Sequence, residues 1–121
     1  MIYKVGMLVK HFKGTSLLDK NIYRILKLNV RGKDVDTSVV TYTGDGVLEN
    51  AYGLVVYENV FQEGKVFARE YNDISSELSF DKQEYYHQRF KVEPLTEAET
   101  ELVNNPNFIE KKTELTKERF N

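Results

Sequence analysis

Short runs of alternating apolar and polar residues fill roughly residues 1–70 and predict β-strands rather than helices. The predicted strands span residues 5–12, 22–30, 37–43, 54–61 and 66–69. The run 22–30 is apolar on both of its alternating faces, with Ile22, Leu26 and Leu28 on one face, which is typical of a strand buried on two sides. The chain from Gln62 to Lys65 contains a glycine and predicts a hairpin between the last two strands.

Glycine-containing polar segments separate these strands. In the turn Arg31–Asp34 we expect Gly32 to adopt a positive φ angle, because that conformation suits glycine best. The strongest turn signal of the chain is Gly44-Asp45-Gly46.

The pattern changes after Tyr71. Residues 73–80 predict an irregular or helical piece, and residues 81–86 a brief helix capped by its first Asp and a Glu three positions on. Residues 89–92 predict a last strand, which we expect Pro94 to stop.

The C-terminal residues carry two helix start signals. Thr96 and Glu99 form a capping-box pattern for a helix that reaches about Val103. Asn105 and Pro106 then suit the N-cap and first position of another helix. The segment 107–120 has sparse apolar residues, so we expect it either to dock by one narrow stripe or to be partly free.

These elements predict a mainly β fold, either a small barrel or a strongly bent antiparallel sheet with C-terminal helices. The β-rich body would span residues 1–93. Residues 94–121 would form a helical tail.

Composition narrows the class further. The 121 residues suffice for one compact domain, and 40% hydrophobic with 30% charged residues is ordinary for a globular protein. A net charge of −2, from 17 basic and 19 acidic residues, disfavours binding to nucleic acid. The absence of cysteine excludes disulfides and thiolate metal sites. No apolar run resembles a secretion signal or a membrane span, so we expect a cytoplasmic protein without membrane partners.

Four short motifs occur in an order that resembles a known family: His11-Phe12-Lys13-Gly14, Tyr23-Arg24-Ile25-Leu26, Leu54-Val55-Val56-Tyr57 and Val66-Phe67-Ala68-Arg69. The family comprises small bacterial and phage proteins classed as a domain of unknown function. Its members open with H-F-K-G and continue with an L-V-V-Y strand and an aromatic-x-Arg strand.

The resemblance covers residues 5–80, and it implies that residues at about 31–53 are a hairpin insertion relative to the short members. The sequence departs from the family pattern at two positions. Phe67 stands where the family usually has Trp, and Glu70 stands where it usually has Pro. The resemblance implies an SH3-like β-barrel and carries no known activity with it.

The first motif and Arg69 are candidate anion-binding groups. His11 and Lys13 beside a glycine turn offer a ring N–H and a mobile ammonium, although the same residues also fit a plain strand end with Phe12 in the core. Arg69 offers a guanidinium fork for phosphate or carboxylate, or equally an ion pair with Glu58 or Glu70. If the barrel closes, Arg69 would share a pocket with the first motif.

The hexapeptide Tyr85–Phe90 concentrates three rings, a histidine and an arginine. Such a segment suits stacking on a ligand or a hot spot for a protein partner. It fits equally a segment that buries alternate rings over the barrel mouth. Tyr86 is the ring of this segment that we include among the candidate binding residues.

Positive signals for catalysis or metal binding are lacking. His11 and His87 are the only histidines, and their spacing does not suggest a zinc site. An acidic loop begins like a calcium loop at Asp34 and Asp36, but its sixth position is Val39 where glycine is required. No nucleophile-elbow pattern occurs. We therefore predict no cofactor and no metal.

The sequence thus predicts a non-enzymatic binding module that recognises a protein or a small anionic ligand through aromatic and cationic side chains. The candidate binding residues are His11, Lys13, Tyr42, Tyr57, Arg69 and Tyr86. Alternatives are a sequestering protein, possibly encoded by a phage, for an anionic nucleotide-like metabolite, and a hydrolase that uses a histidine base. Exposed strand edges also favour a homo-oligomer.

Overall fold

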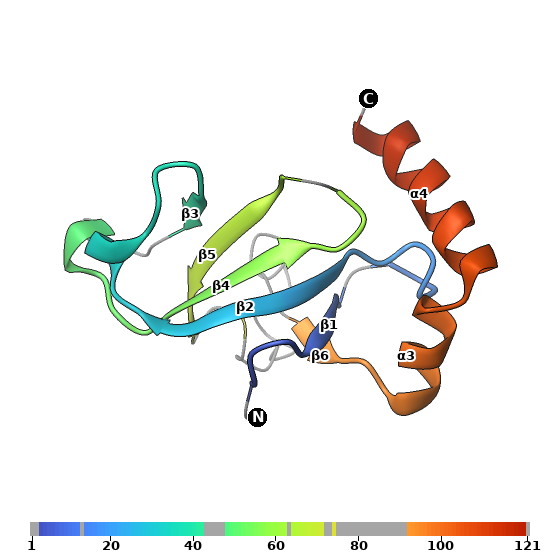
Figure 1. Ribbon diagram of the computed structural model, residues 1–121, viewed down its shortest axis with the longest axis horizontal. Coiled ribbons are helices and arrows are strands. Elements are labelled where there is room, and N and C mark those ends of the chain that lie inside the picture. The colour runs from blue at the N-terminus through green and yellow to red at the C-terminus, as the bar shows by residue number, and fades with distance from the viewer. Residues whose placement is uncertain are drawn as a thin grey trace, which may run out of the picture.

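A bent β-sheet with two helices at one end forms the molecule in the computed structural model (Figure 1). The structure describes residues 3–12, 14–42, 48–62, 64–71, 74 and 92–120. The strands are β1 (Leu8–His11), β2 (Ile22–Val30), β3 (Val40–Tyr42), β4 (Leu54–Asn59), β5 (Val66–Glu70) and β6 (Val92–Pro94). The helices are α3 (Glu97–Val103) and α4 (Pro106–Phe120), and short 3-10 turns occur at η1 (Gly32–Asp34) and η2 (Leu48–Asn50).

The strands of the described part form one six-stranded sheet in the order β3-β5-β4-β2-β1-β6. It is open, with β3 and β6 as its edges, so the mainly β class with C-terminal helices is confirmed without a closed barrel. The prediction of a purely antiparallel sheet is wrong at one pair, because β3 runs parallel to β5. The chain reverses direction between β3 and β4 and again in the β4–β5 hairpin, so β3 and β5 run the same way.

Strand β2 has the predicted bounds, but its alternation does not continue along its whole length. The pairing with β4 shifts register between Ile25 and Lys27, which marks a β-bulge or similar irregularity. As a result Lys27 is exposed, and Leu28 packs against the same cluster as Ile25. The prediction that Leu28 shares a face with Ile22 is therefore wrong. One extra residue in a strand turns all later side chains to the opposite face of the sheet.

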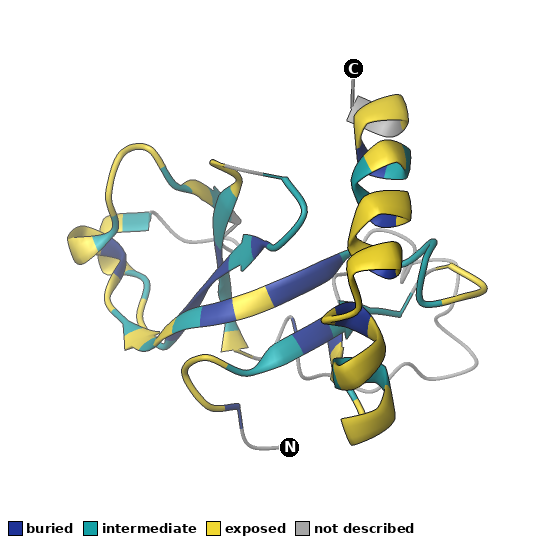
Figure 2. Ribbon diagram, turned by 45° about the vertical axis from the view of Figure 1, so that its right-hand side comes forward, coloured by how far each residue is buried: buried dark blue, intermediate teal, exposed yellow. Residues whose placement is uncertain are grey.

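Two hydrophobic clusters lie on the sheet, and Figure 2 shows the buried positions along β2. The larger cluster comprises Tyr3, Val9, Tyr23, Ile25, Val55, Tyr57, Ile74 and Val92. The smaller one joins the sheet to the helices through Ile22, Val103 and Phe108. The start of β2 is thus buried on both sides, as the sequence predicted.

Local capping signals define both helices where the sequence placed them. The Thr96 hydroxyl accepts a hydrogen bond from the Glu99 backbone N–H at 3.1 Å, and the Glu99 carboxylate accepts one from the Thr96 N–H at 3.0 Å. The side chain of Asn105 likewise accepts from the Asn107 N–H at 2.9 Å. Lys10 ties β1 to α3 by donating to both carboxylate oxygens of Glu99, at 2.9 and 2.7 Å.

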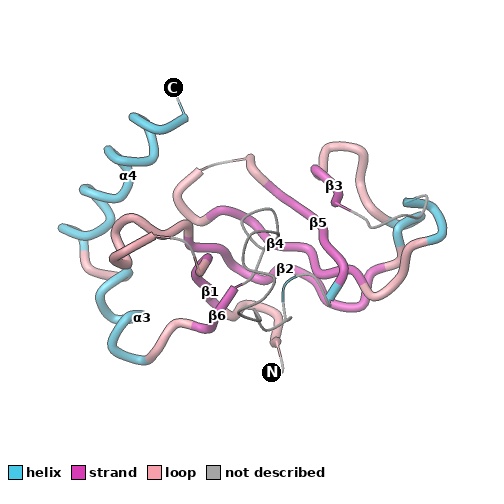
Figure 3. The backbone as a smooth tube through the Cα atoms, turned by 180° about the vertical axis from the view of Figure 1, so that it is seen from behind, coloured by secondary structure: helices cyan, strands magenta, loops and turns pink. Residues whose placement is uncertain are grey.

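Helix α4 docks by a narrow stripe, which decides between the two predicted possibilities. Phe108, Lys112 and Thr116, spaced four residues apart, are its buried residues among those whose side chains are described. The Lys112 ammonium donates to the backbone carbonyls of Leu18, at 2.6 Å, and of Lys20. Figures 1 and 3 show α4 rising above α3 at the end of the sheet where β2 begins. Neither described helix combines the length and apolar character that crossing a membrane requires.

One turn prediction needs correction. Gly32 is absent from the residues with positive φ, and it is required for close packing instead, since an added Cβ would lie 1.6 Å from the carbonyl oxygen of Leu48. The last strand does end at Pro94, as predicted, and Pro94 itself pairs in register with Val9, which an edge strand tolerates. The predicted elements at residues 75–91, and the turn Gly44-Asp45-Gly46, lie outside the described residues.

Candidate functional site

The structure brings together three of the predicted site residues, on β3, β4 and β5. Arg69 donates from its Nε to the hydroxyl of Tyr57 at 3.1 Å, and Tyr42 pairs in register with Arg69 across the parallel strands. Tyr57 is only 2% exposed, and its ring stacks on Phe67 with centroids 5.5 Å apart. Tyr57 is thus a core ring, and its hydroxyl helps to hold the Arg69 guanidinium.

The remaining predicted residues are not brought to this cluster by strand pairing. His11 ends β1, which β2 and β4 separate from β5, and its ring lies 4.8 Å from that of Phe12. The sequence prediction relied on closure of a barrel to join His11 to Arg69, whereas the sheet of the described part is open. Lys13 and Tyr86, together with the rest of 85–90, lie outside the described residues.

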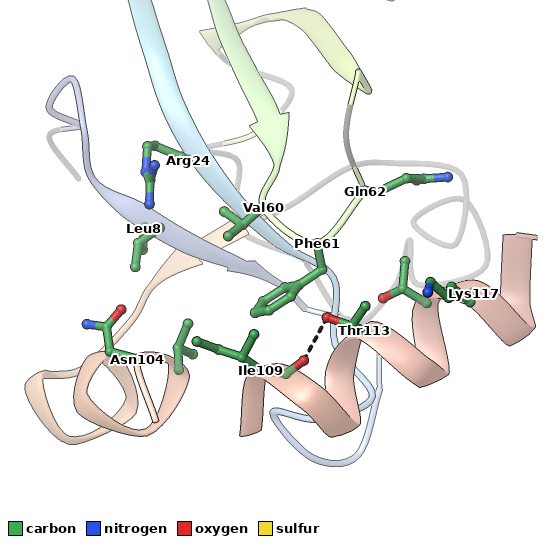
Figure 4. Close-up of a pocket in the computed structure, with 11 residues that line it drawn as sticks. Leu8, Arg24, Val60, Phe61, Gln62, Asn104, Ile109, Thr113 and Lys117 are labelled. Carbon is green, nitrogen blue, oxygen red and sulfur yellow. Dashed lines mark hydrogen bonds between the residues drawn. The ribbon is translucent and has the colours of Figure 1, made fainter. Parts of the chain in front are cut away.

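A pocket of about 620 Å³ lies between the sheet and the two helices, near the smaller hydrophobic cluster (Figure 4). Its apolar lining comes from Leu8, Val60, Phe61, Val103 and Ile109. Its polar lining comes from Arg24, Gln62, Asn104, Thr113, Thr116 and Lys117. The pocket therefore combines a substantial apolar surface with hydrogen-bond donors and cations.

The apolar part occupies the middle of the pocket. Phe61 follows β4 and lies over Ile109 of α4 in Figure 4. The Phe61 ring also meets Phe108 with centroids 6.2 Å apart and planes inclined by 63°. Because Phe108 is only 8% exposed, this aromatic pair anchors the wall against the core.

The polar groups lie mainly at the two ends of the pocket. Arg24 and Asn104 mark one end, and Gln62 and Lys117 mark the other (Figure 4). Within the part of the chain that the structure describes, the side chains of Gln62, Asn104 and Lys117 make no hydrogen bond or ion pair. Among the described residues, the Arg24 guanidinium forms one ion pair, with Glu58 at 3.8 Å, which exceeds the length of a hydrogen bond. These donors are therefore available to a ligand.

The two hydroxyl groups in the pocket already donate within their own helix. Thr113 donates to the carbonyl of Ile109 at 2.7 Å, and Thr116 donates to that of Lys112 at 2.9 Å. Each hydroxyl oxygen retains a lone pair that can accept a hydrogen bond. The pocket thus offers donors at its ends and acceptors along the wall formed by α4.

A smaller cavity of about 430 Å³ is mainly aromatic, with Tyr3, Tyr52 and Tyr71 in its lining. Tyr3 and Tyr71 meet edge to face, with centroids 5.6 Å apart. The Tyr3 hydroxyl donates to the carbonyl of Ile74 at 3.0 Å. Burial, with a smaller contribution from Tyr71, raises the pKa of Tyr3 to about 12. No charged side chain of the described residues lines this cavity, so it offers less for recognition.

Metal chemistry has no support in the described residues, among which no group of three or more His, Asp or Glu side chains is placed to hold an ion. No protein-family model matches the chain, and neither curated proteins nor solved structures gave a match. The resemblance to the bacterial and phage family therefore stays a prediction.

Sequence reasoning missed the pocket between sheet and helices. One signal was visible, since Arg24 interrupts an otherwise apolar face of β2. Its neighbours in the pocket come from β1, the β4–β5 connection and the two helices, and no local pattern indicates that these segments meet.

Proposed function

We propose that this protein is a non-enzymatic binding module that takes a small amphipathic molecule between its sheet and its C-terminal helices. The pocket of about 620 Å³ carries this proposal, because an apolar centre with a few polar groups at its ends is the usual composition of a ligand site. Sequestration of a metabolite is the alternative that the sequence predicted. It would be binding of a small molecule in the same pocket, with high affinity.

The identity of the lining residues supports binding over turnover. The described lining contains no histidine or carboxylate that would serve as a general base, and both threonine hydroxyls donate to helix carbonyls. His11, the base considered in the hydrolase alternative, is not among the lining residues.

The proposal retains the predicted relation to SH3-like barrels. The two register shifts between β2 and β4 support it, because such irregularities bend strands in small barrels. Binding in a groove beside the sheet would then rest on an analogy between folds. The pocket itself supports the binding function more strongly than this analogy does.

The test is a thermal-shift screen against small amphipathic acids, amines and neutral compounds, with two tryptophan variants. Ile109→Trp places an indole in the pocket, whereas Glu110→Trp places the same group on the exposed surface one residue along α4. A ligand at one hundred times its Kd adds about 2.7 kcal/mol of stability, which raises Tm by several degrees.

We expect dose-dependent stabilisation of the wild type and of Glu110→Trp, and none of Ile109→Trp. Equal stabilisation of all three proteins would place the ligand elsewhere. If no compound of the panel shifts the wild type, the small-ligand function is wrong.

A further inference from the structure

We propose that the Arg24 end of this pocket recognises an oxyanion, so that the ligand is an elongated amphipathic acid. Its carboxylate, sulfonate or phosphate group would bind Arg24, and its apolar body would extend over Phe61 and Ile109 toward Lys117 (Figure 4). This inference rests on the proposed function and adds the chemical class and orientation of the ligand.

Arg24 is held in place by its strand, and its guanidinium makes no hydrogen bond to the residues that the structure describes. It lies on β2, in register with Leu8 on one side and Glu58 on the other, so paired strands fix its backbone on both sides. Its side chain is 46% exposed, and its approach to Glu58, at 3.8 Å, is an ion pair without a hydrogen bond. The planar guanidinium therefore retains the paired N–H groups that bind an oxyanion by two parallel hydrogen bonds.

Glu58 modulates the affinity of the Arg24 end of the pocket for anions. Its carboxylate, 37% exposed, offsets part of the Arg24 charge and repels a second negative charge nearby. A singly charged head group is therefore favoured over a doubly charged one. Removal of the Glu58 charge should strengthen the binding of an acid.

Asn104 supplies a second polar group at the same end. It is the C-cap residue of α3, and its backbone N–H already donates to carbonyls of that helix. Its side-chain amide, without a partner in the described part of the chain, remains free to donate to a ligand oxygen.

Lys117 provides a matched comparison within the same pocket. It carries the same formal charge, but it is exposed on α4 at the opposite end. An exposed ammonium is strongly hydrated and acts as a point charge, without the geometry of a guanidinium fork. If only net charge matters, loss of Lys117 should weaken anion binding as much as loss of Arg24.

The experiment compares two fluorescent probes that share a ring skeleton. The probe 8-anilinonaphthalene-1-sulfonate carries one negative charge, whereas N-phenyl-1-naphthylamine lacks the sulfonate and is neutral. Both are titrated into the wild type, Arg24→Gln, Arg24→Lys, Lys117→Gln and Glu58→Gln. Circular dichroism melting confirms that each variant is folded.

We expect one sulfonate probe per chain, bound about tenfold more weakly by Arg24→Gln, because a charge-assisted pair of hydrogen bonds is lost. Arg24→Lys should lie between the wild type and Arg24→Gln. Lys117→Gln should weaken sulfonate binding less than Arg24→Gln does, since the exposed ammonium is screened and lacks the guanidinium fork. Glu58→Gln should bind the sulfonate more tightly, and the neutral probe should respond little to any of these changes.

Three outcomes would overturn the inference in different ways. If both probes bind and Arg24→Gln affects neither, the oxyanion site is wrong and the binding function stands. If Arg24→Gln and Lys117→Gln weaken the sulfonate equally, attraction is by net charge and no specific site exists. If neither probe binds the wild type, the proposed function fails together with the inference.

Discussion

The ammonium of Lys112 joins the last helix to the loop before β2. Its side chain is only 3% exposed, and it donates to the carbonyl of Leu18 at 2.6 Å and to that of Lys20. The substitution Lys112→Met keeps a flexible chain of similar length and similar helix propensity but removes the donor. It tests whether this polar contact holds α4 on the sheet.

The expected cost follows from the lost hydrogen bonds. Two charge-assisted hydrogen bonds contribute about 3–6 kcal/mol together. Removal of a buried charge returns part of this, because the ammonium no longer has to be desolvated. We therefore expect Lys112→Met to lower the free energy of unfolding by about 2–4 kcal/mol, which most small domains survive.

The assay is urea unfolding followed by circular dichroism, together with amide hydrogen exchange of the folded protein. Lys111→Met is the matched control, since Lys111 precedes Lys112 on the same helix and is exposed. Exchange in α4 should accelerate more than exchange in β2, because the helix loses its attachment before the sheet opens. If Lys112→Met unfolds within about 0.5 kcal/mol of Lys111→Met, the carbonyls do not hold the helix and the reasoning is refuted.

Three further changes have clear expected outcomes. The pKa of Tyr3 is raised from its ordinary value near 10 to about 12, so its contribution to stability is complete below pH 10 and is lost as pH rises toward 12. Absorbance titration of Tyr3→Phe should show one fewer late-ionising tyrosine than the wild type. Hydrogen bonds, the largest effect being that from Lys10, lower the pKa of Glu99, so its contribution to stability is present above the unfolded pKa and is lost as pH falls. Acid unfolding of Glu99→Gln should therefore depend less on pH than that of the wild type, and equal slopes of stability against pH would contradict this. Gly32→Ala should destabilise by about 1–3 kcal/mol or more in urea melts, because its Cβ meets the Leu48 carbonyl oxygen; an unchanged midpoint would show that the loop relaxes freely.

Much of the local structure was predictable because its causes lie within a few residues of one another. The pair Thr96 and Glu99 defined the start of α3, and Asn105 with Pro106 defined that of α4. The apolar run 22–30 is strand β2, and the glycine turn after β4 forms the expected hairpin.

The candidate site was less predictable than the fold. Arg69 does bond Tyr57 and pairs in register with Tyr42, because neighbouring strands place alternate residues on one face. The same alternation could not reveal that Tyr57 would be covered by other rings of the core. Nor could it place His11, whose position depends on whether the sheet closes.

The sequence by itself determined which segments are strands and helices and which faces are apolar, since periodicity and capping are local properties. Only the tertiary structure decided what those faces meet. It placed Lys112 on carbonyls of the loop before β2, contacts that span 94 and 92 positions of sequence. It also set Arg24 opposite the two helices to form the pocket. An apolar pattern indicates that a residue is buried away from water, but many packing partners would satisfy that requirement equally well. The packing of the whole chain therefore decides which residues meet.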